Sequence, residues 1–172
     1  MVSELDNYLQ RIEDLRGQVY ELIADLPAEA LNWRPSEQVE SHATNSLAVL
    51  AAHIAGSEHF WIGEVVGRLP ATRNRPAEFT TQTAGAEELC QLLEKTGVET
   101  RAVIAALDPA DLNGTRQVDG RPVPVRWSIV HVIDHTALHL GHMQLTYQLW
   151  TEGKSKPSPA WDQRLPRSKP DS

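Results

Sequence analysis

The stretch that decides the fold is residues 127–150, WSIVHVIDHTALHLGHMQLTYQLW. Within it, His131, His135 and His139 follow one another at intervals of four residues, and His142 comes three residues later. Side chains at this spacing lie along one face of an α-helix. The segment is therefore predicted to be a helix that carries four imidazoles in one axial stripe.

Three further segments have apolar residues at every third or fourth position, which is typical of amphipathic helices. The first begins with Ser3 as its N-cap, and Asp6 completes a capping-box-like pair. The second is capped by one of the three polar residues at 44–46, and the last is ~25 residues or ~38 Å long. The predicted helices cover residues 3–26, about 44–67, about 84–107 and about 126–151. Four such helices without clear strands predict an all-α four-helix bundle.

The segments between the predicted helices are long. A polar link covers residues 28–43, and a loop rich in Pro, Arg and Thr covers residues 69–83. Either is long enough to cross over, so the order and direction of the helices stay open. Residues 113–124 are either an irregular loop or a short hairpin. We expect residues 1–152 to form one four-helix-bundle domain, and 153–172 to be an extended tail containing Pro, Lys and Arg.

The composition excludes several classes of protein. One cysteine, Cys90, rules out a disulfide framework and a cysteine-rich zinc module, and we expect it to be packed among leucines. The 16 basic and 23 acidic residues give a net charge of -7, which argues against a nucleic-acid partner. The longest apolar run, residues 47–52, is far shorter than the ~20 residues that cross a bilayer. Without a signal-peptide pattern at the N-terminus, we expect a cytoplasmic protein with no membrane partner.

The histidine stripe admits two interpretations. Two histidines at i and i+4 can chelate one metal ion, and a third ligand from a facing helix completes a site with an open position. His53, close to the inward face of the second predicted helix, offers that ligand. Alternatively, the stripe holds neutral rings in a polar layer, or solvated imidazoles. Val132, not Glu, follows His131, so the general base of zinc peptidases has no counterpart here.

Two stretches of the chain resemble the DinB-like (YfiT-like) superfamily. They are residues 31–67, LNWRPSEQVESHATNSLAVLAAHIAGSEHFWIGEVVG, and residues 126–145, RWSIVHVIDHTALHLGHMQL. In the first, an apolar run leads into a histidine, a small-residue step, a glutamate and aromatic residues. In the second, two histidines four apart precede a glycine and a polar residue. The residues that carry the resemblance are His53, Glu58, Trp61, His135, His139, Gly141 and His142.

The resemblance covers roughly residues 5–150 and implies a four-helix bundle, often dimeric, with a divalent metal ion. Carried over to this chain, the implied ligands are His53, His135 and His139. The family motif places a glycine two residues after its second ligand, so Gly141 selects His139, whereas spacing alone allows the pair His131 and His135. Many members are thought to be transferases or isomerases that use a low-molecular-weight thiol such as mycothiol or bacillithiol.

The chain departs from the family pattern at two positions. Members often have Arg directly after the second helix-four histidine and Gln two residues beyond it. Leu140 and His142 occupy these places here, which leaves the thiol and the substrate unspecified. Three residues are candidates for catalytic roles: Glu58, His131 and His142. Glu58 is either an acceptor for an imidazole N–H or a surface carboxylate.

Arg126 and Trp127, at the start of the last predicted helix, are candidates for cofactor or anion binding, although Trp127 suits the core equally well. His-rich sites accept Zn, Ni, Cu and Fe, of which we expect Zn or Ni. The leading hypothesis is a transferase that activates a mycothiol-, bacillithiol- or glutathione-like thiol for a small-molecule substrate, in a homodimer. The alternatives are a non-catalytic metal- or small-molecule-binding, stress-associated bundle, and a metal-assisted hydrolase.

Overall fold

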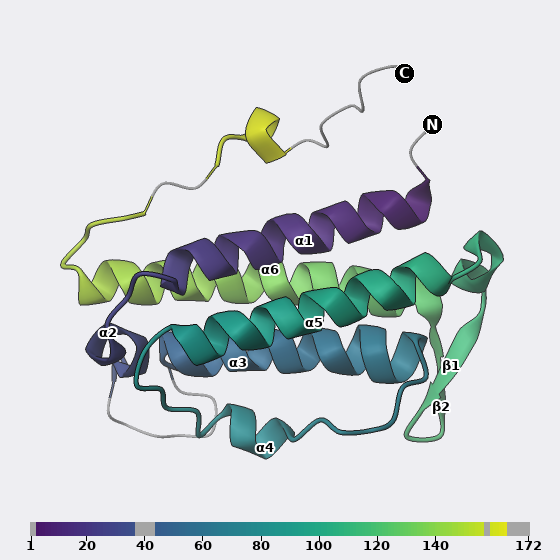
Figure 1. Ribbon diagram of the computed structural model, residues 1–172, viewed down its shortest axis with the longest axis horizontal. Coiled ribbons are helices and arrows are strands. Elements are labelled where there is room, and N and C mark those ends of the chain that lie inside the picture. Colours follow the sequence, from purple (N-terminus) through teal and green to yellow (C-terminus); the bar gives the residue numbers. More distant parts are fainter. Residues whose placement is uncertain (1–2, 37–43, 157–158, 165–172) are drawn as a thin grey trace.

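Four long helices, packed side by side, dominate the computed structural model, which describes residues 3–36, 44–156 and 159–164 (Figure 1). The long helices are α1 (Glu4–Ile23), α3 (Leu47–Glu58), α5 (Glu87–Ala106) and α6 (Val125–Trp150). Helix α3 continues directly into a π-helical stretch, η1 (His59–Val66), so the two together cover the second predicted helix. The predicted all-α class is confirmed, with one two-stranded hairpin as a minor addition.

Two of the helix starts are set by the hydroxyl groups of serines. The Ser3 hydroxyl accepts the Asp6 backbone N–H, and the Asp6 carboxylate accepts the Ser3 N–H, both at 3.1 Å. This capping box satisfies donors that the first helical turn cannot, as the sequence predicted. Of the three candidate caps at 44–46, Ser46 is the one used: its hydroxyl accepts the backbone N–H of Val49.

The connections decide the order and direction that the sequence left open. Helices α1 and α3 each pack against both α5 and α6. The segment from α3 to α5, which carries α4 (Arg75–Glu78), returns along the length of the bundle, so α3 and α5 run in the same direction (Figure 1). Helices α1 and α6 both run the opposite way. The arrangement is therefore not a strict up-and-down bundle.

The shorter segments also hold regular structure. The polar link begins with α2 (Ala28–Asn32), while residues 37–43 lie outside the described part. After η2 (Pro109–Asn113), strands β1 (Thr115–Val118) and β2 (Arg121–Pro124) pair antiparallel, so residues 113–124 contain a hairpin. Asp119 and Gly120 form its two-residue turn with φ values of 50° and 75°. Positive φ at both positions is what a type I′ turn requires, and it matches the twist of the paired strands.

A buried ion pair links three of the four long helices. Arg16 of α1 donates from Nη1 to Oε1 of Glu58 at the end of α3, over 2.5 Å, and Thr100 of α5 donates to the same oxygen. Gly97 makes room for the arginine, because a Cβ there would lie 2.7 Å from the guanidinium. Burial raises the pKa of Glu58, while Arg16 and the Thr100 hydroxyl act to lower it.

The position of Glu58 corrects one of the sequence predictions. Its side chain is fully buried, so the surface alternative is wrong. Its described hydrogen-bond partners are Arg16 and Thr100, not an imidazole. The carboxylate therefore faces the interior between α1 and α5, and not the histidine stripe. Its spacing of five residues from His53 turns it to a different side of α3.

The described part of the tail lies along α1. Lys156 donates from Nζ to the backbone carbonyls of Glu21 and Leu22, which are at the C-terminal end of α1. A cation suits this helix end, because its last carbonyls have no partners within the helix. Further on, the tail forms one turn, η3 (Trp161–Arg164), from which Arg164 binds Asp14. Among the described residues, no helix has both the length and the apolar character needed to span a membrane.

We predict that Arg16→Met lowers the free energy of unfolding by about 3–5 kcal/mol, because it leaves a buried carboxylate without its counter-charge. Urea denaturation at pH 7 measures the effect. Burial raises the pKa of Glu58, so the folded variant holds a proton there more tightly than the unfolded chain. The deficit should therefore shrink as the pH falls. Arg101→Met removes exposed ion pairs and should cost less than about 1 kcal/mol. Equal losses in the two variants would contradict the assigned role of Arg16.

Candidate metal centre

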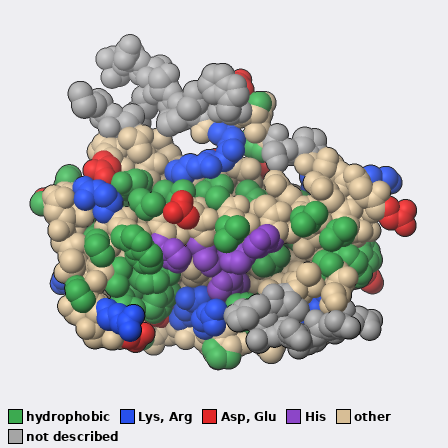
Figure 2. Space-filling view, turned by 180° about the vertical axis from the view of Figure 1, so that it is seen from behind, with side chains coloured by type: hydrophobic (Ala, Val, Ile, Leu, Met, Phe, Trp, Pro, Cys, Tyr) green, Lys and Arg blue, Asp and Glu red, His purple; other side chains and the backbone are tan. Residues whose placement is uncertain are grey.

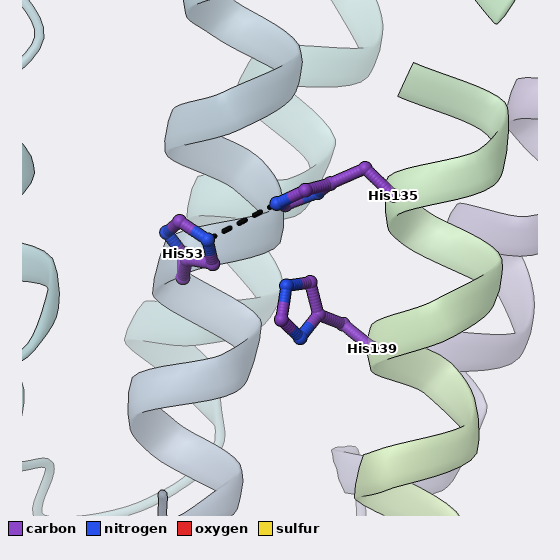
Figure 3. A group of neighbouring side chains, drawn as sticks. All are labelled: His53, His135 and His139. Atoms are coloured by element: carbon purple, nitrogen blue, oxygen red, sulfur yellow. Dashed lines mark hydrogen bonds between the residues drawn. The ribbon is translucent and has the colours of Figure 1, made fainter. Parts of the chain in front are cut away.

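Three histidines converge from two neighbouring helices. His53 extends from α3, and His135 and His139 extend from successive turns of α6 (Figure 3). One nitrogen of each lies within 4.8 Å of the others, and the Nε2 atoms of His53 and His135 are 3.1 Å apart. Among the described residues, no other group of three His, Cys, Asp or Glu meets this spacing. The structure thus brings together the three residues that the family resemblance implied as ligands.

His135 and His139, the two members of the group on α6, are held in their neutral form. Burial, together with the neighbouring imidazoles, lowers the pKa of His135 to about 3 and that of His139 to about 4. At neutral pH each ring therefore keeps one nitrogen lone pair, which is the form in which histidine binds metal ions. The Nδ1 atom of His135 is buried without a hydrogen-bond partner in the described structure. This donor chemistry fits a divalent cation.

A carboxylate behind His53 sets the orientation of its ring. Oε2 of Glu78 lies 2.7 Å from Nδ1 of His53. An ionised carboxylate can only accept hydrogen bonds. Nδ1 of His53 therefore carries the proton, and Nε2 of His53 presents its lone pair towards His135. Metal-ligating histidines in proteins commonly have such a carboxylate partner. His53 is thereby prepared to act as a ligand through Nε2.

Arg73 keeps that carboxylate charged. It donates from Nε to Oε1 of Glu78 over 2.7 Å and from Nη2 to Oε2 over 3.0 Å, as a two-pronged pair. Burial alone would raise the pKa of Glu78, but the hydrogen bonds from His53 and Arg73 outweigh it, and the pKa is lowered. The carboxylate is therefore ionised at neutral pH and able to hold the Nδ1 proton of His53.

Gly56, one turn after His53, gives Glu78 its place against α3. A Cβ at this position would lie 2.1 Å from Oε1 of Glu78, so no larger residue fits without displacing the carboxylate. Sequence reasoning missed both Glu78 and Arg73, which lie in the loop that it described only by composition. The one signal available was the small-residue step after His53, which marks a close approach of another element.

The other two histidines of the stripe have different surroundings. His142 lies next to a predicted ligand, with its Nδ1 3.4 Å from Nδ1 of His139. The ring of His131 lies 5.6 Å from that of His135, but stacks on Trp127 with centroids 4.8 Å apart. The Trp61 ring packs edge-on against the rings of both Trp127 and His131. Of the four histidines in the stripe, His135 and His139 thus converge with His53, His142 lies beside them at the surface, and His131 belongs to an aromatic cluster.

The two candidates for cofactor or anion binding lie away from the histidine group. Arg126 binds the Glu4 carboxylate and the Leu112 carbonyl, which ties the start of α6 to α1 and η2. Trp127 is 49% exposed, so the alternative that placed it in the core is wrong. The contacts of Arg126 therefore connect helices to one another. The ring of Trp127 packs against Trp61 and His131.

The histidine group is accessible from outside. Figure 2 shows a strip of histidine side chains at the surface, bordered by hydrophobic side chains and by Lys or Arg side chains. A cavity of about 450 Å³ opens beside His53, His139 and His142. This volume falls within the range of small-molecule sites. The site therefore combines three neutral nitrogen donors with room for a ligand.

Comparison with known proteins identifies relatives at the level of fold and family. A family model described as the DinB superfamily matches residues 11–143. A DinB-like protein from Bacillus cereus ATCC 10987 has 16% identity and a TM-score of 0.72, covering 92% of this chain and 100% of the other. A conserved protein from Enterococcus faecalis has 16% identity and a TM-score of 0.66, covering 88% and 99%. At this identity the structures show the fold alone. No curated protein matches the sequence.

We predict that Glu78→Gln weakens zinc binding about 10- to 100-fold, because an uncharged amide, which can donate as well as accept, holds the Nδ1 proton of His53 less firmly than a carboxylate. Competition with a chromophoric chelator measures the affinity. Gly56→Ala should have a similar effect, since its methyl group displaces the same carboxylate. Glu99→Gln is the matched control: Glu99 pairs with His59 at 2.7 Å, outside the histidine group, and the affinity should stay unchanged. Equal zinc affinity in Glu78→Gln and wild type would remove the role assigned to Glu78.

Proposed function

The chain belongs to the DinB superfamily, and on that premise we propose that its domain of residues 1–152 is a divalent-metal-dependent transferase. It would use a low-molecular-weight thiol of the mycothiol, bacillithiol or glutathione type, with Zn or Ni as the ion. The observation that carries the proposal is the group of His53, His135 and His139 beside an open cavity. Three histidine nitrogens are the donor set of catalytic zinc sites that retain an open position.

In this proposal, each histidine of the group gives one neutral nitrogen. A divalent ion held by such donors lowers the pKa of a thiol or water that binds it. The chain supplies the orientation: Glu78 keeps the proton of His53 on Nδ1, and burial keeps His135 and His139 uncharged. Because the donors carry no charge, the histidines themselves do not offset the charge of a cation.

The environment of Cys90 supports an external source of sulfur. Cys90 is the single cysteine of the chain, and it is buried on α5. Burial raises the pKa of its thiol, which disfavours the reactive thiolate. It also lines a different cavity, together with Tyr20 and Glu94. A thiol reaction at the histidines would therefore take its sulfur from a cofactor or substrate.

Of the predicted catalytic residues, His142 has the position that best suits a role in proton transfer. It is exposed, lines the cavity and lies beside His139. His131 would act only through its neighbour His135. Glu58 has no part in the proposal, since its carboxylate is engaged with Arg16 and Thr100.

That placement of Glu58 also affects the alternatives. A metal-assisted hydrolase needs a base near the bound water, and Glu58 was the candidate on the second predicted helix. Its burial between α1 and α5 removes the observation that favoured a hydrolase. A non-catalytic metal-binding bundle shares the same histidines, and only the activity of the loaded protein separates it from a transferase.

We predict that the zinc- or nickel-loaded protein accelerates the reaction of one thiol, from a panel of the named types, with an activated aryl halide. His139→Ala should reduce kcat/KM about 100-fold or more, because it removes one of three donors. Loss of the thiol and release of halide measure the rate. His59→Ala changes a histidine that pairs with Glu99 outside the group, and should keep full activity. Equal rates for wild type and His139→Ala would favour the non-catalytic alternative.

We also propose that the protein is a homodimer through the outer face of α6. Trp127 and Leu138, which precede the cavity-lining leucines, are 49% and 59% exposed along this face. Apolar side chains gathered on one exposed face commonly mark an interface.

Leu138→Glu should therefore shift the molar mass from dimer to monomer, because it places a charge in the apolar contact. Light scattering coupled to size-exclusion chromatography measures this mass. Val98→Glu, at a valine of similar exposure on α5, should remain dimeric. A monomeric wild type would contradict the proposal.

A further inference from the structure

The cavity beside His53 and His139 has a wall that is largely apolar. Leu50 and Phe79 contribute from the inner side, and Leu145 and Leu149 from α6. The last two are more than half exposed, so they remain in contact with water unless a ligand covers them. Burial of apolar surface is the main favourable contribution to binding in such sites. The wall therefore favours a ligand with an apolar body.

The described residues that line the cavity carry charge of one sign. The chain has 23 acidic residues and a net charge of -7, yet no Asp or Glu is among the described residues that line this cavity. Arg75 is the single Lys or Arg in that lining. Because the described lining holds one arginine and no carboxylate, it favours an anion.

Arg75 is available to bind that anion. Its guanidinium lies over the Phe79 ring, 5.0 Å from the centroid, and no carboxylate of the described residues forms an ion pair with it. Arg73, two residues earlier, is by contrast fully engaged with Glu78. Stacking on the ring orients a planar guanidinium, whose paired N–H groups match the two oxygens of a carboxylate.

We propose that this cavity binds an apolar monocarboxylate, with its carboxylate on Arg75 and its body against Leu145 and Leu149. The evidence for binding comes from the cavity itself. The role of the carboxylate as the second substrate of the thiol transfer rests on the proposed function. Asn45 and Thr44, which also line the cavity, add side-chain hydrogen-bond donors. His53 and His139 also line this cavity, so the ligand lies beside the histidine group.

Calorimetry on the metal-free protein tests the binding without the attraction of a metal ion for anions. The probes are octanoate, octylammonium and acetate, which share either the chain or the charge. Octanoate should bind at least about tenfold more tightly than either of the others. The difference in affinity between octanoate and octylammonium measures the contribution of the charge. The difference between octanoate and acetate measures the contribution of the apolar wall. Equal affinities for octanoate and octylammonium would overturn the proposal.

Variants at one position then assign the carboxylate to its partner. Arg75→Gln should weaken octanoate binding about tenfold or more, and Arg75→Lys should restore part of the loss. Arg121→Gln, at an exposed arginine on the hairpin, is the matched control and should bind like wild type. Unchanged affinity in Arg75→Gln would overturn the assignment. Because no metal or thiol is present, failure of the transferase assay would leave this binding result intact.

Discussion

The ionised carboxylate of Glu78, buried against α3, is the constraint on which the histidine group depends. It keeps the proton of His53 on Nδ1 and orients the ring so that Nε2 faces His135. A buried carboxylate keeps its charge only when it is paired and hydrogen-bonded, and the two-pronged contact with Arg73 provides both. Gly56 provides the space. The segment that returns from α3 to α5 therefore does more than connect helices, because it delivers Glu78 to the back of His53.

A comparison of the two buried glutamates shows how surroundings separate their roles. Glu58 receives one arginine nitrogen and one hydroxyl, both at the same oxygen, and its Oε2 has no described partner. Burial raises its pKa, whereas the pKa of Glu78 is lowered by His53 and Arg73 against the effect of burial. Glu58 therefore links three helices, while Glu78 orients the ring of His53. Each pair is accommodated by a helical glycine, Gly97 or Gly56.

The histidine stripe is regular along α6, but its four members meet different neighbours. Each ring extends from the same helix, so the difference comes from what packs beside it. His135 and His139 face α3, and they converge with His53. His131 meets tryptophans at one end, and His142 borders the cavity at the other. The open side of the group is therefore the side of the cavity, where no described carboxylate competes for a cation or repels an anion.

The sequence by itself determined the four long helices, the cap at Ser3, the cap at Ser46 to within three residues, and the placement of four histidines on one helix face. The choice of His53, His135 and His139 among the histidines came from the family resemblance. Helix period and capping act over three or four residues, so they can be read locally. Only the tertiary structure decided the parallel course of α3 and α5, the burial of Glu58 and the partnership of Glu78 with His53. These contacts join residues 25 or 42 positions apart. Which distant side chains meet depends on how the helices pack and on where a connection returns, and no local pattern encodes that choice.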